Sequence, residues 1–391
     1  METPRLLLDR SALEANITRG QAVAEGLGLA LRPHVKTHKS LHVARLQLTA
    51  GAAGLTASKA DEALVFMEGF AGELPDVTCA YPLVDRVKLG RLLEAAQHTG
   101  VRLRCMADGP GTVDALADAA ESAGHAPSVL LKIDVGLHRC GLAPTIDGRD
   151  NPALPALGLR VRERGLDLSG ILSHAGHAYG SRDAAAALEI AREECALMAR
   201  AKAALEDAGL DVPVVSVGST PTVLALELAE DAEEWASGLT ELRPGNYVFL
   251  DRAALRLGLA RPGDMALTVA ATVVSANHGH IICDAGSKVL SSDGGAHGSS
   301  QPGFGLAWPE DIWLEGRWGD ADAGPMIVDK LSEEHGWLLP PDSGPRPAVG
   351  DRVRIVPNHA CAVANLADSF TVLEPDGSTD SWPVHARGTV L

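Results

Sequence analysis

Residues 32–39 read Arg-Pro-His-Val-Lys-Thr-His-Lys, and Lys36 follows directly on a short apolar run at residues 29–35. A strand at 29–35 would deliver this amine to its carboxyl end, where open α/β sheets and barrels place their active sites. A lysine sheltered there loses hydration and its pKa falls, so the amine can act as a nucleophile or a proton carrier. The alternative is a solvated basic loop, because Arg32 and Lys39 lie close by in the sequence.

Seven more short apolar runs follow, and most are separated by longer amphipathic segments such as residues 84–97 and 183–208. With 29–35, the predicted strands lie at residues 54–58, 77–82, 101–108, 128–135, 168–175, 212–219 and 242–249. Eight strand-then-helix units predict a (β/α)8 TIM barrel, with a doubly wound parallel sheet as the alternative.

After residue 252 the pattern changes to strand-like runs without helices, separated by stretches rich in glycine, proline and serine. This pattern is typical of a β-rich domain with long loops. We therefore expect a barrel at residues 11–250 and a C-terminal antiparallel β-domain made of residues 251–391 together with residues 1–10. The glycine-rich stretch 291–305 is either a lid or a dimer contact, and the sequence does not decide between them.

Charge and composition argue against several kinds of partner. The 391 residues carry a net charge of −17 and no basic block, which argues against nucleic acid and anionic membranes as partners. No apolar run has the length of a signal peptide or a membrane span. The six cysteines are scattered without a Cys-x-x-Cys pair, so we expect a cytoplasmic protein with free thiols.

A second signal lies at the end of the seventh predicted strand, where Gly218, Ser219 and Thr220 form a turn before Pro221. Pro221 suits the first position of a helix, and Ser219 or Thr220 suits its N-cap. Free N–H groups, hydroxyls and the helix dipole would then converge on one point, which favours a phosphate. The alternative is an ordinary helix cap. No nucleotide-binding motif competes, so the pattern indicates a small phosphorylated cofactor.

A third signal is His359 and Cys361, which follow a strand-like run at residues 353–356. Residues two apart on a strand face the same way, so the pair can hold one metal ion through a nitrogen and a thiolate. Two ligands are too few for a closed structural site and leave positions open for water or substrate. The alternative is a buried thiol beside a histidine that has its own partners.

Smaller signals lie at other predicted strand ends. Arg139 follows the fifth strand, His174 and Tyr179 lie at the end of the sixth, and Asn246 and Tyr247 lie in the eighth. Each of these polar residues alone is common in a loop, but together they lie at the same end of the predicted barrel.

Together these residues resemble the fold-type III pyridoxal-phosphate enzymes related to alanine racemase, and within them the D-serine dehydratase and D-threonine aldolase family. Residues 33–39 match the cofactor-lysine motif of that family, and residues 331–336 and 357–366 match its C-terminal motifs. The resemblance spans essentially the whole chain. It implies a barrel that binds pyridoxal 5′-phosphate, a C-terminal β-domain and a head-to-tail homodimer.

The resemblance also implies roles for individual residues. Lys36 would carry the cofactor as a Schiff base and act as general base, and His359 and Cys361 would bind a divalent metal that takes part in catalysis. The residues expected around the cofactor, with the phosphate held by the turn at 218–220, are Arg139, His174, Tyr179, Gly218, Ser219, Thr220, Asn246 and Tyr247.

The implied substrates are small D-β-hydroxy amino acids: D-serine, D-threonine or 3-hydroxy-D-aspartate. The implied reaction is dehydration to a 2-oxo acid and ammonia, with aldol cleavage to glycine and an aldehyde as the alternative. The aldolases of the family carry an aspartate where this chain has Cys361, which favours dehydration here. A thiolate also favours zinc over manganese or magnesium. An amino-acid racemase and a non-catalytic carrier of the cofactor are further alternatives.

Overall fold

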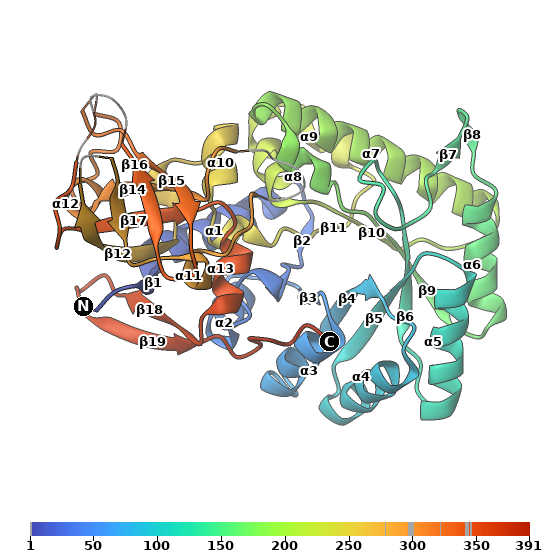
Figure 1. Ribbon diagram of the computed structural model, residues 1–391. Coiled ribbons are helices and arrows are strands. Elements are labelled where there is room, and N and C mark those ends of the chain that lie inside the picture. Colours follow the sequence, from blue (N-terminus) through green and yellow to red (C-terminus); the bar gives the residue numbers. More distant parts are fainter. Residues whose placement is uncertain (1, 278, 296–300, 321, 341–343, 345) are drawn as a thin grey trace.

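A computed structural model describes residues 2–277, 279–295, 301–320, 322–340, 344 and 346–391. The chain forms a barrel surrounded by helices, and a β-rich part lies beside it (Figure 1). None of the described helices has the length and apolar character needed to cross a membrane.

The barrel is built from eight parallel strands in the order β2-β11-β10-β9-β6-β5-β4-β3. A parallel bridge between His34 and Thr56 joins β2 to β3 and closes the ring. The strands are β2 (Ala30–Leu31), β3 (Leu55–Ala57), β4 (Asp76–Pro82), β5 (Arg102–Ala107), β6 (Ser128–Lys132), β9 (Asp167–Leu172), β10 (Val214–Val217) and β11 (Glu241–Leu242). The predicted (β/α)8 barrel is therefore confirmed, and the doubly wound sheet is excluded.

Helices cover the outside of the barrel (Figure 1). They are α1 (Arg10–Gly26), α2 (Leu41–Thr49), α3 (Ala60–Gly69), α4 (Arg86–Thr99), α5 (Pro110–Ala123), α6 (Ala153–Glu163), α7 (Ala184–Asp207), α8 (Thr220–Ala225) and α9 (Ala232–Ala236). Capping residues in the sequence determine where several of these helices begin and end. At the start of α7, the carboxylate of Asp183 accepts a hydrogen bond from the N–H of Ala186. At the end of α4, Gly100 adopts a left-handed conformation with φ 72°. A short hairpin, β7 (Thr145–Ile146) and β8 (Arg149–Asp150), precedes α6.

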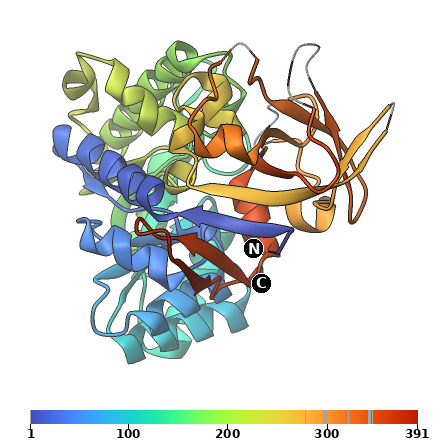
Figure 2. The same ribbon diagram turned by 90° about the vertical axis from the view of Figure 1, so that its left-hand side faces the viewer.

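The β-rich part is a nine-stranded sheet in the order β13-β16-β15-β14-β17-β12-β1-β18-β19. Its strands are β1 (Arg5–Asp9), β12 (Leu267–Ala276), β13 (Ile281–Cys283), β14 (Gly305–Pro309), β15 (Met326–Leu331), β16 (Gly336–Leu339), β17 (Arg352–Pro357), β18 (Ser369–Leu373) and β19 (Thr379–Pro383). The first strand lies inside this sheet, because Leu7 pairs with Thr268 on β12 and with Thr371 on β18 (Figure 2). The division into two domains at residue 250 is our interpretation of this arrangement.

Two details of the predicted elements are wrong. The eighth barrel strand ends at Leu242, so Asn246 and Tyr247 lie in a 3-10 turn, Asn246–Val248, and not in a strand. The β-rich part also contains short helices that the sequence pattern did not indicate. They are α10 (Arg252–Leu257), α11 (Ser287–Leu290), α12 (Glu310–Leu314) and α13 (Ala360–Leu366). These helices have at most seven residues, too short for a helical period to stand out.

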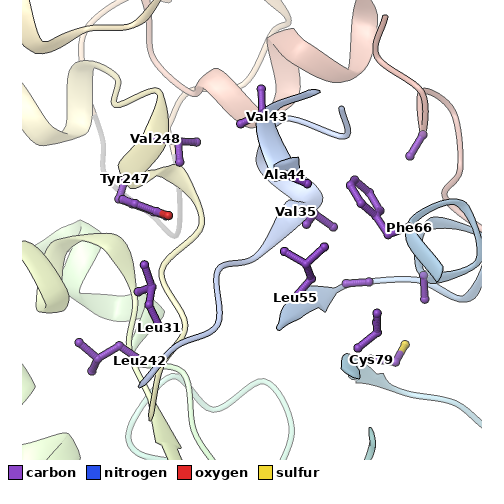
Figure 3. Close-up of a cluster of buried hydrophobic side chains, with 14 of the residues drawn as sticks. Leu31, Val35, Val43, Ala44, Leu55, Phe66, Cys79, Leu242, Tyr247 and Val248 are labelled. Carbon is purple, nitrogen blue, oxygen red and sulfur yellow. The ribbon is translucent and has the colours of Figure 1, made fainter. Parts of the chain in front are cut away.

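Small and medium apolar side chains fill the core, as the low aromatic content of the chain requires. Figure 3 shows one such cluster, in which Leu31, Val35 and Leu55 meet side chains from α2, α3 and the segment after β11. Val35 is fully buried, and it anchors the backbone directly before Lys36. All six cysteines are free.

Charged side chains also lie inside the barrel. Arg32 forms ion pairs with Asp76 and with Glu241, the latter at 2.8 Å, and Arg104 bridges the same two carboxylates at 3.2 and 3.3 Å. All four side chains are at most 9% exposed. Lys39 is buried as well and pairs with Glu62 at 2.8 Å. The alternative of a solvated basic loop at residues 32–39 is therefore wrong.

Candidate active site

A pocket opens at the carboxyl end of the barrel, and every barrel strand except β10 contributes a lining residue from its end or from the following loop. The lining residues are His34, Lys36, Ser58, Ala80, Tyr81, Met106, Lys132, Arg139, Cys140, Leu172, Ser173, His174 and Arg243. This is the end at which (β/α)8 barrels hold their catalytic groups.

Lys36 lies in a single 3-10 turn, Val35–Thr37, that follows β2. The side chain of His34 caps this turn by accepting from the N–H of Lys36 at 3.4 Å. Burial, the largest influence, lowers the pKa of Lys36; the nearby Cys361 opposes this effect, and the charge of Arg139 adds to it. The position and the lowered pKa are those expected of a reactive amine.

The pocket is rich in positive charge. Lys132 and Arg243 line it together with Lys36 and Arg139, and none of the lining residues is an aspartate or glutamate. Burial lowers the pKa of Lys132 to about 7, and the charge of Arg243 contributes to this shift. Arg243 is fixed in place because its Nε donates to the hydroxyl of Ser216 at 2.5 Å. Such a lining suits a ligand that carries several negative charges.

The turn at residues 218–220 lies next to the pocket. His174 lines the pocket, and its Nδ1 lies 3.2 Å from the carbonyl oxygen of Gly218. Ser219 is the N-cap of α8 and forms a capping box with Thr222. The expected helix start is therefore present, although Pro221 takes the second helical position and not the first. Since the Ser219 hydroxyl already caps the helix, a phosphate here would depend chiefly on backbone N–H groups.

Tyr179 and Asn246 lie between this turn and the β-rich part. Burial raises the pKa of Tyr179, which lies beside Thr220, Asp251 and Cys361, so its phenol stays protonated. The side-chain amide of Asn246 donates to Asp251 Oδ2 at 2.6 Å. These two residues are close to the expected site, although neither lines the pocket itself.

The side chain of Tyr247 points elsewhere. Its ring is 1% exposed and lies among apolar side chains of the core (Figure 3). It packs against α1 so closely that the ring leaves no room for a Cβ on Gly20. Its hydroxyl accepts a hydrogen bond from Gln47 on α2 at 3.0 Å. We therefore correct the expectation for Tyr247, whose side chain is a core residue in this structure.

His359 and Cys361 lie beside the Lys36 loop. The Sγ atom of Cys361 is 3.2 Å from the hydroxyl of Thr37, the residue after Lys36. His359 is the N-cap of α13 and Cys361 lies in its first turn. The pair is thus brought together by a helix start, and the alternating faces of a strand were the wrong reason for expecting it.

The charges of this pair favour metal binding. Burial alone would raise the pKa of Cys361, but the neighbouring His359, Lys36 and Thr37 together outweigh it and the pKa is lowered. Burial would likewise lower the pKa of His359, but Cys361 and Asp293 raise it. A thiolate beside an imidazole is a suitable donor set for zinc. Among the described residues, no group of three or more His, Cys, Asp and Glu side chains could hold a metal ion.

Asp293 supports the histidine from the glycine-rich stretch 291–305, of which residues 296–300 lie outside the described part of the chain. Its Oδ2 atom is 2.7 Å from Nδ1 of His359, which leaves Nε2 for a metal ion. The neighbouring Asn358 is held by Arg252 at 3.0 Å and donates to the carbonyl oxygen of Gly303 at 2.8 Å. The two described ends of the stretch therefore border the candidate metal site.

Sequence reasoning missed Lys132, Arg243 and Asp293. The first two carried a usable signal, because Lys132 ends the fifth barrel strand and Arg243 follows the eighth, at the end of the barrel where the site was expected. Asp293 carried none, since it is 66 residues from His359 in a loop without periodic pattern.

The residues present fit pyridoxal 5′-phosphate. An amine with a lowered pKa lies in a cationic pocket, beside a turn that ends in a helix start. An aldehyde, a phenolic oxygen and a phosphate on one small molecule match these three features.

Comparisons with known proteins agree with the fold. Residues 8–253 match the family described as "Alanine racemase, N-terminal domain", and residues 266–373 match "Putative serine dehydratase domain". The chain is 36% identical to D-threo-3-hydroxyaspartate dehydratase of Delftia sp. (strain HT23), over 98% of this chain and 97% of that protein. It is 29% identical to a D-threonine aldolase of Arthrobacter sp, over 99% and 93% of the two chains.

The solved structure of the Delftia dehydratase superposes with a TM-score of 0.84 at 33% identity, over 98% of this chain and 97% of that chain. Two further solved structures named D-threo-3-hydroxyaspartate dehydratase also match: one has a histidine replaced by alanine, and the other has a cysteine two positions further on replaced by alanine "in the metal-free form". His359 and Cys361 are also two positions apart.

Proposed function

The chain belongs to the family of alanine racemase-like barrels that carry a serine dehydratase domain, and from this premise we propose a pyridoxal 5′-phosphate-dependent lyase. Its reaction is the dehydration of a D-β-hydroxy amino acid to a 2-oxo acid and ammonia. The observation that carries the proposal is the contact between the Lys36 loop and the His359–Cys361 pair, through Thr37 and Cys361 at 3.2 Å.

Lys36 would hold the cofactor, with its phosphate at residues 218–220 and its ring beside Arg139 and His174. When bound to an amino acid, the cofactor withdraws electrons from the α-carbon and makes its proton acidic. The Nζ atom of Lys36, once released, would remove that proton, because its lowered pKa keeps more of the amine neutral near pH 7. Tyr179, whose pKa is raised, would offer a hydrogen bond and not a negative charge.

His359 and Cys361 would hold a divalent ion, most simply zinc given the thiolate. Such an ion supplies Lewis acidity to a hydroxyl group on the substrate. Cys361 would also fix the distance from this ion to Lys36, because Thr37 contacts its sulfur. The acid and the base would then act on neighbouring carbons of one small substrate.

The lining of the pocket supports 3-hydroxy-D-aspartate as the substrate. That compound has a second carboxylate, and Lys132, Arg139 and Arg243 surround the pocket without any acidic side chain in the described lining. The higher identity to the Delftia dehydratase, 36% against 29% for the aldolase, supports the same substrate and dehydration over aldol cleavage. Aldol cleavage is the second candidate, because the relatives named as aldolases match almost the whole chain.

One assay separates these activities. The protein, loaded with the cofactor and zinc, is incubated with the D and L forms of serine, threonine and threo-3-hydroxyaspartate, and products are quantified. We expect ammonia and a 2-oxo acid from the D forms, with 3-hydroxyaspartate turned over fastest. Glycine and an aldehyde would indicate an aldolase, and an amino acid of inverted configuration would indicate a racemase. If no product forms, the protein is a non-catalytic carrier of the cofactor.

We also propose that the enzyme works as a head-to-tail homodimer in the cytoplasm. Three apolar side chains near the pocket mouth, Tyr81, Val84 and Val87, are 42–72% exposed and would be covered by a second copy. The six free cysteines suit a reducing compartment. Sedimentation equilibrium tests the dimer, and a purely monomeric mass would refute it.

A further inference from the structure

The C-terminal segment, residues 384–389, returns from β19 to the barrel and lies against the loop that carries Lys36. The N–H of Ala386 donates to the carbonyl oxygen of Lys39 at 2.9 Å, and the N–H of Leu41 donates to Nδ1 of His385 at 3.2 Å. Val384 and Ala386 are buried. In Figure 1 the C-terminus is drawn beside α3 of the barrel.

Lys39 makes most of this contact. Its Nζ atom lies 3.3 Å from the carbonyl oxygens of Ala386 and Thr389 and 3.4 Å from the Thr389 hydroxyl. The residue is 6% exposed and has a positive φ of 52°, a conformation that a side chain other than glycine seldom adopts. Surrounding contacts hold such a backbone in place, here the contacts with Ala386 and Thr389 and the bond from the N–H of Lys39 to the carbonyl oxygen of Val35 at 2.8 Å. Lys36 lies just three residues earlier.

The other side of Lys39 leads to the pocket. Its Nζ atom pairs with Glu62 Oε1 at 2.8 Å, and Glu62 Oε2 accepts from the N–H of Ser58 at 2.6 Å. The hydroxyl of Ser58 is 3.3 Å from Nε2 of His34. Ser58 and His34 both line the pocket, and His34 caps the turn of Lys36. A continuous set of polar contacts therefore joins the C-terminal segment to two walls of the pocket.

We propose that residues 384–389 form a strap that fixes the Lys36 loop, and that Lys39 is the positioning residue that joins the strap to the pocket. Without the strap the loop loses its outer support, and both the turn at Val35–Thr37 and the wall at Ser58 loosen. The protein then releases pyridoxal 5′-phosphate more readily. This inference rests on the proposed function only in taking the pocket as the cofactor site.

The competing explanation is that Lys39 merely balances the charge of Glu62. Glu62 is fully buried, so removal of its partner alone would leave an uncompensated charge and weaken the fold for that reason. Lys39→Met combined with Glu62→Gln removes both charges and this penalty with them. The contacts of Nζ with Ala386 and Thr389 stay lost in the double variant, so it separates the two explanations.

The experiment compares the wild type, the double variant Lys39→Met/Glu62→Gln and a chain that ends at Pro383. Each protein is loaded with pyridoxal 5′-phosphate, and the rate of cofactor loss into an excess of an aldehyde trap is followed by absorbance. Amide hydrogen exchange at residues 33–41 is measured in parallel, with and without the cofactor. Arg387→Ala is the matched control, because Arg387 belongs to the strap but its side chain faces Asp368 at the surface.

We expect the double variant and the shortened chain to lose the cofactor about tenfold to hundredfold faster, the range for charge-assisted hydrogen bonds lost from a buried site. Exchange at residues 33–41 rises in both, and Arg387→Ala behaves as the wild type. If the double variant retains the cofactor and exchanges its amide hydrogens as the wild type does, Lys39 only balances the charge of Glu62. If the shortened chain behaves as the wild type, residues 384–389 do not act as a strap. If no protein takes up the cofactor, the proposed function fails, while the exchange measurement still tests the strap.

Discussion

The hydroxyl of Thr37 lies 3.2 Å from the sulfur of Cys361, although the two residues are 324 positions apart. Thr37 follows Lys36 in the barrel, and Cys361 lies on α13 in the β-rich part. The contact brings the loop that carries Lys36 against the helix that carries Cys361. Neither part of the chain has a complete site alone.

The role of Lys36 is tested by Lys36→Ala. We expect this variant to show no visible absorbance after incubation with pyridoxal 5′-phosphate and no turnover, because the aldehyde then has no amine at this position to bind. Borohydride reduction of the wild type should fix the cofactor to the peptide that contains Lys36, as read by mass spectrometry. Lys330→Ala, at an exposed position on β15, serves as the control. Fixation of the cofactor at Lys132 would contradict the assignment.

The metal site is tested by Cys361→Asp. Replacing the thiolate with a carboxylate should lower the affinity for zinc, because soft thiolate ligands favour zinc. The ratio of the manganese affinity to the zinc affinity should rise. Titration with each metal against a chromophoric chelator measures both affinities. In the wild type, a strong chelator should abolish turnover and added zinc should restore it. Turnover that persists in excess chelator would remove the metal from the proposed mechanism.

Asp293 should matter for metal affinity without touching the metal. Its carboxylate holds Nδ1 of His359 at 2.7 Å, and loss of such a partner typically weakens metal binding about 10- to 100-fold. We expect Asp293→Ala to show this loss in chelator competition. Asp376→Ala is the matched control. Both aspartates accept a hydrogen bond from the backbone N–H two residues on, Asp293 from Gly295 and Asp376 from Ser378, but Asp376 lies in the exposed turn between β18 and β19. Equal zinc affinity in the two variants would show that Asp293 does not position the histidine.

Lys132 should give the stability of the protein a pH dependence. Its pKa is about 7 in the folded state against 10.5 for an unperturbed lysine, so between these values the unfolded chain binds more protons. Stability attributable to Lys132 is therefore lost as pH falls from about 10 to 7 and changes little below that. In cofactor-free protein, Lys132→Met should remove this loss. Denaturant unfolding at pH 7 and 9.5 measures it, and an identical pH response in the two proteins would contradict the shift.

The four buried charges inside the barrel, Arg32, Arg104, Asp76 and Glu241, form an ion-pair ring whose disruption should lower the stability of the fold strongly. Arg32→Met leaves Asp76 and Glu241 with one arginine between them, and loss of a partner from a buried pair costs about 3–5 kcal/mol. Arg86→Ala, which removes an exposed partner of Asp118, should cost at most about 1 kcal/mol. Chemical denaturation of both variants tests the contrast. Similar losses for both would mean that the ring contributes no more than a surface pair.

Periodic and local signals in the sequence predicted most of the barrel and the centre of the site. The eight strands were visible because parallel strands are apolar along their whole length. Lys36 was visible because it follows the apolar run at residues 29–35, although the strand itself ends at Leu31. Gly218 to Thr220 were found through helix-cap chemistry, which is local and directional. The seven-residue helix α13 was missed, so His359 and Cys361 were found for a reason that the structure does not support.

The features that could not be predicted depend on contacts far apart in the chain. Tyr247 reads like a pocket residue beside Asn246, and only the packing of Gly20 and Gln47 against its ring shows otherwise. The roles of Arg32 and Lys39 depend on carboxylates up to 209 residues away. Side-chain direction and long-range pairing have no signature in a short window of sequence.

The position of β1 has a consequence for how this protein is made. Its backbone pairs with β12 and β18, whose residues leave the ribosome more than 250 positions later. During synthesis the first strand must wait, unpaired, while the barrel segments emerge and begin to assemble. The nascent chain therefore completes its nine-stranded sheet only when translation is nearly over. An N-terminal fusion that holds β1 away would leave β12 and β18 without the strand that lies between them.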